Sequence, residues 1–275
     1  MILDNEVSIR LFSFALILAV MLALELALPR RTIFQPRSLR WTNNFAITIL
    51  NAVMLRLLFP AATVSVALYV EESEFGLLAG LGMPNFMSIP LAIVALDLIT
   101  YAQHRLFHEV PLLWRIHRMH HSDVDIDVTT GLRFHPIEML LSMIIKLLAI
   151  WLLGAPAIAV IFFEVILNAM SMFNHANFHL PEKTDEMLRK GIVTPDMHRV
   201  HHSTRGRETN SNYGFSLSCW DRLFDSYIAQ PEDGHLEMDI GVAEFRETTD
   251  IRLDKILMQP FANSPEPAED TGSNK

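Results

Sequence analysis

Cysteine is nearly absent from this sequence. A single residue, Cys219, occurs among 275, which excludes a disulfide framework and a metal site built from thiolates. An excess of positive charge is lacking as well, because the net charge is −9 and residues 231–275 hold eleven acidic against four basic side chains. Without a basic stripe to neutralise phosphates, nucleic acid is excluded as a partner.

Polar residues are too few for an ordinary soluble domain. Hydrophobic residues make up 51% of the chain, which predicts an integral membrane protein. Pro60 is expected to kink or divide the second apolar run, and Gly154-Ala155-Pro156 to form a tight hairpin between the last two. The first run is expected to be a retained anchor, since no small-residue cleavage site follows it. The apolar runs cover residues 11–28, 45–70, 86–103, 137–153 and 157–173.

Charged residues beside the runs predict their orientation. Arginines 30, 31, 37 and 40 follow the first run, whereas glutamates 71, 72 and 74 follow the second. The positive-inside rule then places the first loop in the cytosol, together with residues 104–136 and the chain after 174. We therefore expect an all-α, multi-span transmembrane helical bundle with a cytosolic helical cap. Its membrane would be the inner membrane of a bacterium or the endoplasmic reticulum of a eukaryote.

The chain divides into three parts on composition. N-terminal membrane spans and loops occupy residues 1–85, and a histidine-rich catalytic domain is expected at 86–230. A polar, acidic tail follows at 231–275, and its end, 262–275, is expected to be disordered.

Histidines gather in one stretch of the chain. Eleven of the twelve lie between residues 104 and 202. Residues three or four apart share a helical face, so each group of histidines is expected to direct its imidazoles to one point. The groups are His104 and His108; His117, His120 and His121; His175 and His179; and His198, His201 and His202.

These ten imidazoles exceed what one catalytic zinc ion can use, since such an ion takes about three protein ligands. They suit two ions of higher coordination number with open positions. Helix-start signals at Pro111 and at Thr194-Pro195 indicate that four helices converge on this two-metal site. His135 stands alone before Pro136 and is kept as a further candidate ligand, whereas His235 is interpreted as a polar residue of the tail.

Five stretches follow one another in order: DLITYAQHRLFH, LWRIHRMHHS, RFHPIE, TPDMHRVHHS and NYGFSLSCWDRLFDSY. In these the chain resembles the fatty acid hydroxylase or sterol desaturase superfamily, which are membrane histidine-rich di-iron enzymes. That family's closing motif usually has Gly-Thr after the phenylalanine, where this chain has Phe224-Asp225-Ser226. The departure touches no histidine and concerns subfamily and substrate.

The resemblance implies a reaction, a cofactor and partners. Two iron ions would activate O₂ for hydroxylation or desaturation of a C–H bond in a lipid, such as a fatty acid, a sterol or a carotenoid. Nothing in the chain resembles a fused electron-transfer domain, so electrons are expected from a separate reductase with a ferredoxin or a b-type cytochrome. The arginine-rich cytosolic face is expected to dock an acidic carrier.

Several polar residues lie inside the apolar runs. Asp97 and Tyr101 share a helical face with His104, and we expect one of them to orient a ligating imidazole directly or through water. A helix–helix hydrogen bond unrelated to metal is the alternative. Lys146 and Glu164 lie at equal distances from the hairpin and are expected to form an ion pair.

Other classes of protein also place histidines near a membrane. A divalent-metal transporter would hold them near the bilayer midplane on broken helices, beside acidic ligands. A b-type haem protein would need isolated axial histidines on facing spans. A metal-dependent lipid hydrolase using zinc is the nearest chemical competitor, and its activity would not require O₂.

Overall fold

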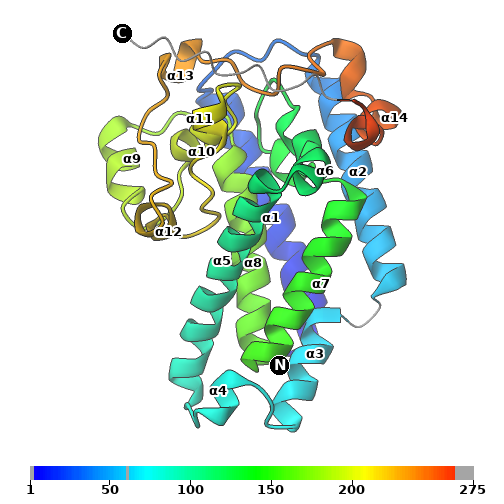
Figure 1. The fold of residues 1–275 in the computed structure, drawn as a ribbon, viewed down its shortest axis with the longest axis vertical. Helices are drawn as coiled ribbons and strands as arrows, with labels where there is room; N and C mark the ends of the chain where they lie inside the picture. Colours follow the sequence, from blue (N-terminus) through cyan, green and yellow to red (C-terminus); the bar gives the residue numbers. More distant parts are fainter. Residues whose placement is uncertain (1–2, 60–61, 264–275) are drawn as a thin grey trace.

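The computed structural model describes residues 3–59 and 62–263. Within these ranges regular structure is helical, apart from isolated bridges between single residues. Five segments are long and apolar enough to cross a membrane, which confirms the expected all-α bundle (Figure 1). After a short turn η1 (Leu3–Asn5), they are α1 (Glu6–Ala27); α2 (Arg37–Leu58) with α3 (Ala62–Glu72) and α4 (Leu77–Gly80); α5 (Asn85–Glu109); α7 (Pro136–Leu153); and α8 (Ala157–His175).

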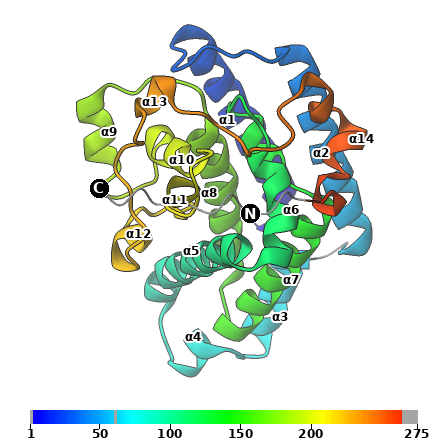
Figure 2. The same ribbon diagram turned by 45° about the horizontal axis from the view of Figure 1, so that its top comes forward.

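Short helices gather at one end of the bundle and form a cap. Figure 2 shows α9, α12 and α13 on one side of this cap and α14 on the other. The cap consists of α6 (Pro111–His121), η2 (Thr130–Leu132), α9 (Glu182–Leu188), α10 (Pro195–His201), α11 (Gly206–Thr209), α12 (Cys219–Leu223), α13 (Gly234–Glu237), η3 (Thr248–Ile251), α14 (Leu253–Ile256) and η4 (Gln259–Phe261).

The α7–α8 hairpin forms as the Gly154-Ala155-Pro156 sequence predicts. Gly154 follows the last residue of α7 with a φ of 65°, a left-handed conformation that glycine adopts without strain. The ion pair expected across this hairpin is present, with Lys146 Nζ 3.0 Å from Glu164 Oε1. Buried alanines at 92, 149 and 159 let α5 approach α7 and α8 closely, as small residues do between membrane helices.

The second apolar run is divided between two helices. α2 ends at Leu58 and α3 begins at Ala62, while Pro60 lies outside the described residues. The tail after residue 231 packs on the cap up to residue 263, where Arg118 donates to the carbonyls of Gln259 and Ala262. Of the segment expected to be disordered, residues 264–275 lie outside the described residues.

Candidate metal centre

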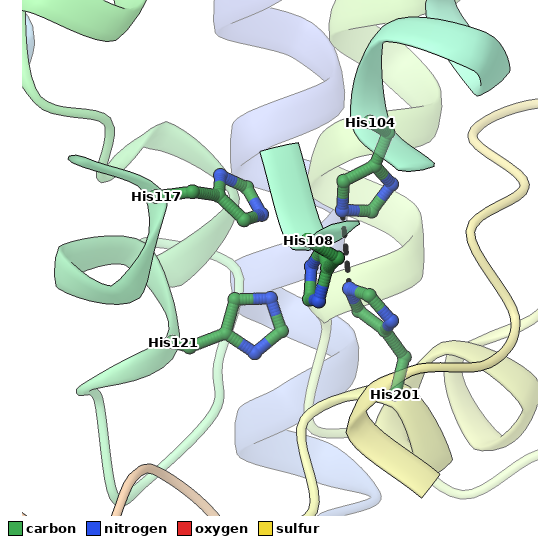
Figure 3. Close-up of side chains that lie close together, drawn as sticks. All are labelled: His104, His108, His117, His121 and His201. Atoms are coloured by element: carbon green, nitrogen blue, oxygen red, sulfur yellow. Dashed lines mark hydrogen bonds between the residues drawn. The ribbon is translucent and has the colours of Figure 1, made fainter. Parts of the chain in front are cut away.

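Nine of the ten histidines of the four sequence groups come together in two clusters within the described residues. In each cluster the candidate ligand atoms lie within 4.8 Å of one another, and all nine side chains are buried. The first cluster faces a common point in Figure 3, with rings supplied by α5, α6 and α10. It contains His104, His108, His117, His121 and His201, and the second cluster contains His120, His175, His198 and His202.

Helical spacing explains how neighbouring histidines reach different clusters. His117 and His121 are four residues apart on α6 and point to the first cluster, while His120 lies between them and joins the second. α10 divides in the same way, since His201 belongs to the first cluster and His198 to the second. The two clusters are therefore adjacent, and α6 and α10 each contribute to both.

Backbone carbonyl groups fix the orientation of four imidazoles. A carbonyl can only accept a hydrogen bond, so the Nδ1 atom facing it must carry the proton, and Nε2 keeps its lone pair. The N–H···O distances lie between 2.7 and 3.0 Å. The pairs are His104 with Tyr213, His120 with Arg133, His175 with Ser171, and His201 with Ser211.

This arrangement brings lone pairs face to face. Nε2 of His104 lies 3.1 Å from Nε2 of His201, and Nε2 of His120 lies 3.1 Å from Nε2 of His175. Because all four Nδ1 atoms donate to carbonyls, neither contact can be a hydrogen bond between neutral rings. A cation between the two nitrogens removes the repulsion, so these residues fit a metal ion in each cluster.

Burial favours the neutral form of several clustered imidazoles. The pKa of His120 and that of His121 are driven well below the ordinary histidine value, first by burial and then by neighbouring imidazoles. Burial likewise lowers the pKa of His201 to about 3. Neutral imidazole is the form that binds metal, and both ring nitrogens of His121 have no hydrogen-bond partner among the described residues.

Glu138 is a site residue that the sequence reasoning missed. Its Oε1 accepts a hydrogen bond of 2.8 Å from Nδ1 of His117, and the residue is only 5% exposed. Among the described residues it is the carboxylate that contacts a clustered histidine. An acidic residue in the first turn of an otherwise apolar helix was the signal that could have identified it.

Two candidate ligands lie apart from both clusters. His179 is exposed, and its backbone N–H donates to the Leu28 carbonyl. His135 caps α7, where Nδ1 accepts from the Ile137 N–H and Nε2 lies 3.3 Å from the Leu257 carbonyl. Both ring nitrogens of His135 are therefore occupied, and neither residue enters the proposed ligand set.

The direct contact expected between a clustered imidazole and Asp97 or Tyr101 does not occur among the described residues, where both side chains have other partners. Asp97 Oδ2 accepts from Trp220 Nε1 at 2.9 Å, and the Tyr101 hydroxyl lies 2.9 Å from Ser226 Oγ. The segment after α11 covers this face of α5 and takes up both polar groups. Asp97 and Tyr101 therefore bind the segment whose Tyr213 carbonyl accepts from His104.

Buried charges from the N-terminal helices hold the loop between α6 and α7. The Arg40 guanidinium of α2 donates two hydrogen bonds of 2.9 Å to Asp123 and one of 2.6 Å to Asp127. Burial alone would raise the pKa of Asp123, but Arg40 and Arg133 outweigh it and hold that pKa at about 2. Glu25 of α1 accepts from the backbone N–H of Val128 in the same loop.

A cavity of about 360 Å³ extends from the histidines into the bundle. Its volume lies at the lower end of the range for small-molecule sites, which suits one hydrocarbon chain. Imidazoles of both clusters line one end, and the wall continues along α5, α7 and α8. Apolar lining residues include Leu96, Ile99, Met143, Ala149, Phe163 and Leu167.

Comparison with known proteins gives matches centred on this region. The family model described as fatty acid hydroxylase matches residues 89–226. The chain is 31% identical over 159 residues to an ornithine lipid hydroxylase of Rhizobium tropici, covering 58% of this chain and 46% of that protein. It is 27% identical over 146 residues to the human alkylglycerol monooxygenase, covering 51% and 31%.

A more distant relative is the Delta(7)-sterol 5(6)-desaturase of Leptosphaeria maculans, which is 26% identical over 160 residues, covering 58% of this chain and 42% of that protein. The matched region thus spans less than half the length of each of these relatives. No solved structure matches the chain significantly.

Proposed function

Since the chain belongs to the fatty acid hydroxylase family, we propose that it is a membrane oxygenase that hydroxylates or desaturates a C–H bond of a lipid. The observation that carries this proposal is the pair of buried histidine clusters with facing Nε2 lone pairs, placed at the end of an apolar cavity. The first cluster would hold one iron ion and the second cluster another. When bound, the iron pair would supply the activation of O₂.

The protein's own groups have separate roles in this proposal. The backbone carbonyls and Glu138 keep the Nδ1 atoms that face them protonated, which leaves the Nε2 lone pairs of those rings available to bind metal. The cavity wall would bind the hydrocarbon and exclude water from the reacting carbon. Hydroxylation would consume O₂, two electrons and two protons and release one water, while desaturation would release two waters.

Lipid analysis of a host that expresses the chain tests this function. The native protein under ¹⁸O₂ is expected to add one labelled oxygen to one lipid class, or to remove two hydrogens from it. His120→Ala should abolish the product, whereas His179→Ala, which changes an exposed histidine outside both clusters, should not. A product that forms equally well without O₂ would instead support a zinc-dependent lipid hydrolase.

The clusters are proposed to face the cytosol, because arginines follow α1 at the cap end of the bundle. The single cysteine offers a direct test, since Cys219 is exposed in the cap. A membrane-impermeant maleimide should label Cys219 in inverted vesicles and fail to label it in intact cells. Labelling of intact cells would reverse the proposed orientation.

An external electron carrier is proposed to dock beside the first loop. Arg30, Arg31 and Arg37 line a surface cavity of about 780 Å³, together with Phe34, which is 81% exposed. Arg30 also donates to Asp196, two residues before His198 of the second cluster. An acidic carrier would complement this surface, and its turnover rate should fall as ionic strength rises. A rate insensitive to salt would contradict the docking.

A further inference from the structure

A charged residue interrupts the apolar wall of the cavity. Lys146 of α7 lines it, and its side chain keeps 21% of its surface exposed. Asn168 of α8 lines the cavity as well, and its Nδ2 donates to the backbone carbonyl of Glu164, the residue that pairs with Lys146. An ionisable group inside a membrane bundle is costly and commonly marks a functional contact.

The charges around Lys146 cancel. Glu164 pairs with Lys146 and also with Arg10, and Arg10 pairs with Glu6 at 3.1 Å. Two cations therefore meet two carboxylates, and an anionic ligand would leave an uncompensated charge in the membrane. A neutral oxygen acceptor would not. The ammonium group has three N–H donors, and Glu164 accepts one of them, so donors remain for such an oxygen.

The distance between Lys146 and the histidines is set by α7. Glu138, which holds His117, lies eight residues before Lys146 on the same helix. At 1.5 Å per residue, the two positions are about 12 Å apart along the axis. A substrate oxygen bound at Lys146 would thus place a carbon roughly eight to ten bonds away beside the clusters.

We propose that Lys146 and Asn168 bind a neutral oxygen of the lipid substrate, an amide or ester carbonyl or a hydroxyl, and thereby select which carbon is oxidised. The selection of the oxidised carbon rests on the proposed oxygenase function. Binding of the oxygen itself does not require catalysis. Lys146 is then a specificity-determining residue. By binding one polar oxygen of the substrate, it would determine which carbon of the hydrocarbon lies beside the clusters.

A binding comparison on purified, metal-loaded protein tests whether Lys146 binds a neutral oxygen of the substrate. The probes are a long-chain N-methyl amide and an alkane of equal length, each titrated by thermal shift. The native protein should bind the amide about tenfold more tightly, since a hydrogen bond to a charged donor contributes that much. Lys146→Met should erase the preference and Lys146→Arg should retain it. Leu148→Met is the matched control, because Leu148 is 53% exposed on the same helix and outside the cavity lining.

Product analysis tests whether Lys146 selects the carbon that is oxidised. With the amide, the native enzyme should oxidise one position, and Lys146→Met should spread oxidation over several positions and raise KM more than it lowers kcat. An amide preference that survives in Lys146→Met, or is missing from the native protein, overturns the proposal. Unchanged oxidation position in Lys146→Met overturns the measuring role. If the amide binds selectively but is never oxidised, the oxygenase function fails while the binding site stands.

The double variant Lys146→Met/Glu164→Gln separates binding from folding. Lys146→Met leaves Arg10 alone against the two carboxylates Glu6 and Glu164, whereas the double variant leaves Arg10 balanced by Glu6, so the double variant should unfold at a higher temperature than Lys146→Met. A site role requires that it still lacks the amide preference. If the double variant recovers both stability and the preference, Lys146 serves only to join α7 to α8.

Discussion

Replacing Glu138 by glutamine should weaken metal binding while sparing the fold. The carboxylate accepts the Nδ1 proton of His117 at 2.8 Å, and a carboxylate in this position makes the imidazole a stronger ligand. A glutamine oxygen can still accept that proton, so the ring keeps its orientation. What is lost is the negative charge, and charge-assisted hydrogen bonds are about twice as strong as neutral ones.

Glu138→Gln is expected to change two quantities, the affinity for metal and the stability of the metal-free protein. Loss of such a partner reduces metal affinity by about 10- to 100-fold, or about 1.4–2.7 kcal/mol. Stability of the metal-free protein should move the other way or hardly at all. Glu138 is 5% exposed and its Oε2 has no partner among the described residues, so the substitution removes a poorly satisfied buried charge.

Titration of the metal-free protein with Fe²⁺ under anaerobic conditions measures the first effect, and thermal unfolding without metal measures the second. Glu208→Gln is the matched control, because Glu208 is equally buried at 5% and, among the residues that the structure describes, also has an unpartnered oxygen and contacts no clustered histidine. If Glu138→Gln binds iron as tightly as the native protein and the control do, a ligand-orienting role for Glu138 is refuted. A large loss of stability without metal would show that Glu138 is structural instead.

Three further predictions concern the scaffold, each measured by thermal unfolding in detergent. Burial raises the pKa of Asp221 to about 6, so the stability that its protonated carboxyl group contributes is present below about pH 4 and is lost as pH rises through 6. Asp221→Asn should therefore be more stable than the native protein by on the order of 2–3 kcal/mol at pH 7 and equally stable at pH 4. Asp225 has a φ of 57°, so Asp225→Gly should stabilise by about 0.5–1 kcal/mol, and a destabilisation would contradict this. Arg40→Met removes the guanidinium that Asp123 and Asp127 share, and it should cost about 3–5 kcal/mol of stability and lower the amount of bound iron, whereas retained stability would show that the loop is held by other contacts.

Helical periodicity made most of the centre predictable. Residues four apart on α5 and α6 share a face whatever surrounds them, so His104 with His108 and His117 with His121 could be grouped from spacing alone. The same spacing rule failed for His179, because the rule holds only where the helix continues through both residues. α8 ends at His175, and the extended backbone that follows carries His179 to the surface.

Contacts between distant segments could not be predicted. The carbonyl groups of Tyr213 and Ser211 orient imidazoles that lie about 10 to 110 residues away in the chain, and no local pattern marks a carbonyl for this use. The Lys146–Glu164 pair was predictable because a two-helix hairpin fixes which positions share a depth.

The altered closing motif has a local explanation. Asp225 occupies the left-handed region, where the glycine usual in the family fits without strain, and aspartate is among the residues that tolerate it. Ser226 supplies a hydroxyl that bonds Tyr101 and Asp221. The departure therefore keeps the geometry of the turn.

Glu25 and Arg40 lie outside the region that defines the family, yet both hold the loop between α6 and α7. A minimal catalytic module cut at residue 89 would lose the acceptor of the Val128 backbone N–H and the guanidinium that Asp123 and Asp127 share. Grafting the module onto other membrane helices would require a buried acid and a buried guanidinium at matching depths. The N-terminal helices are thus part of what any transplanted version of this centre must carry.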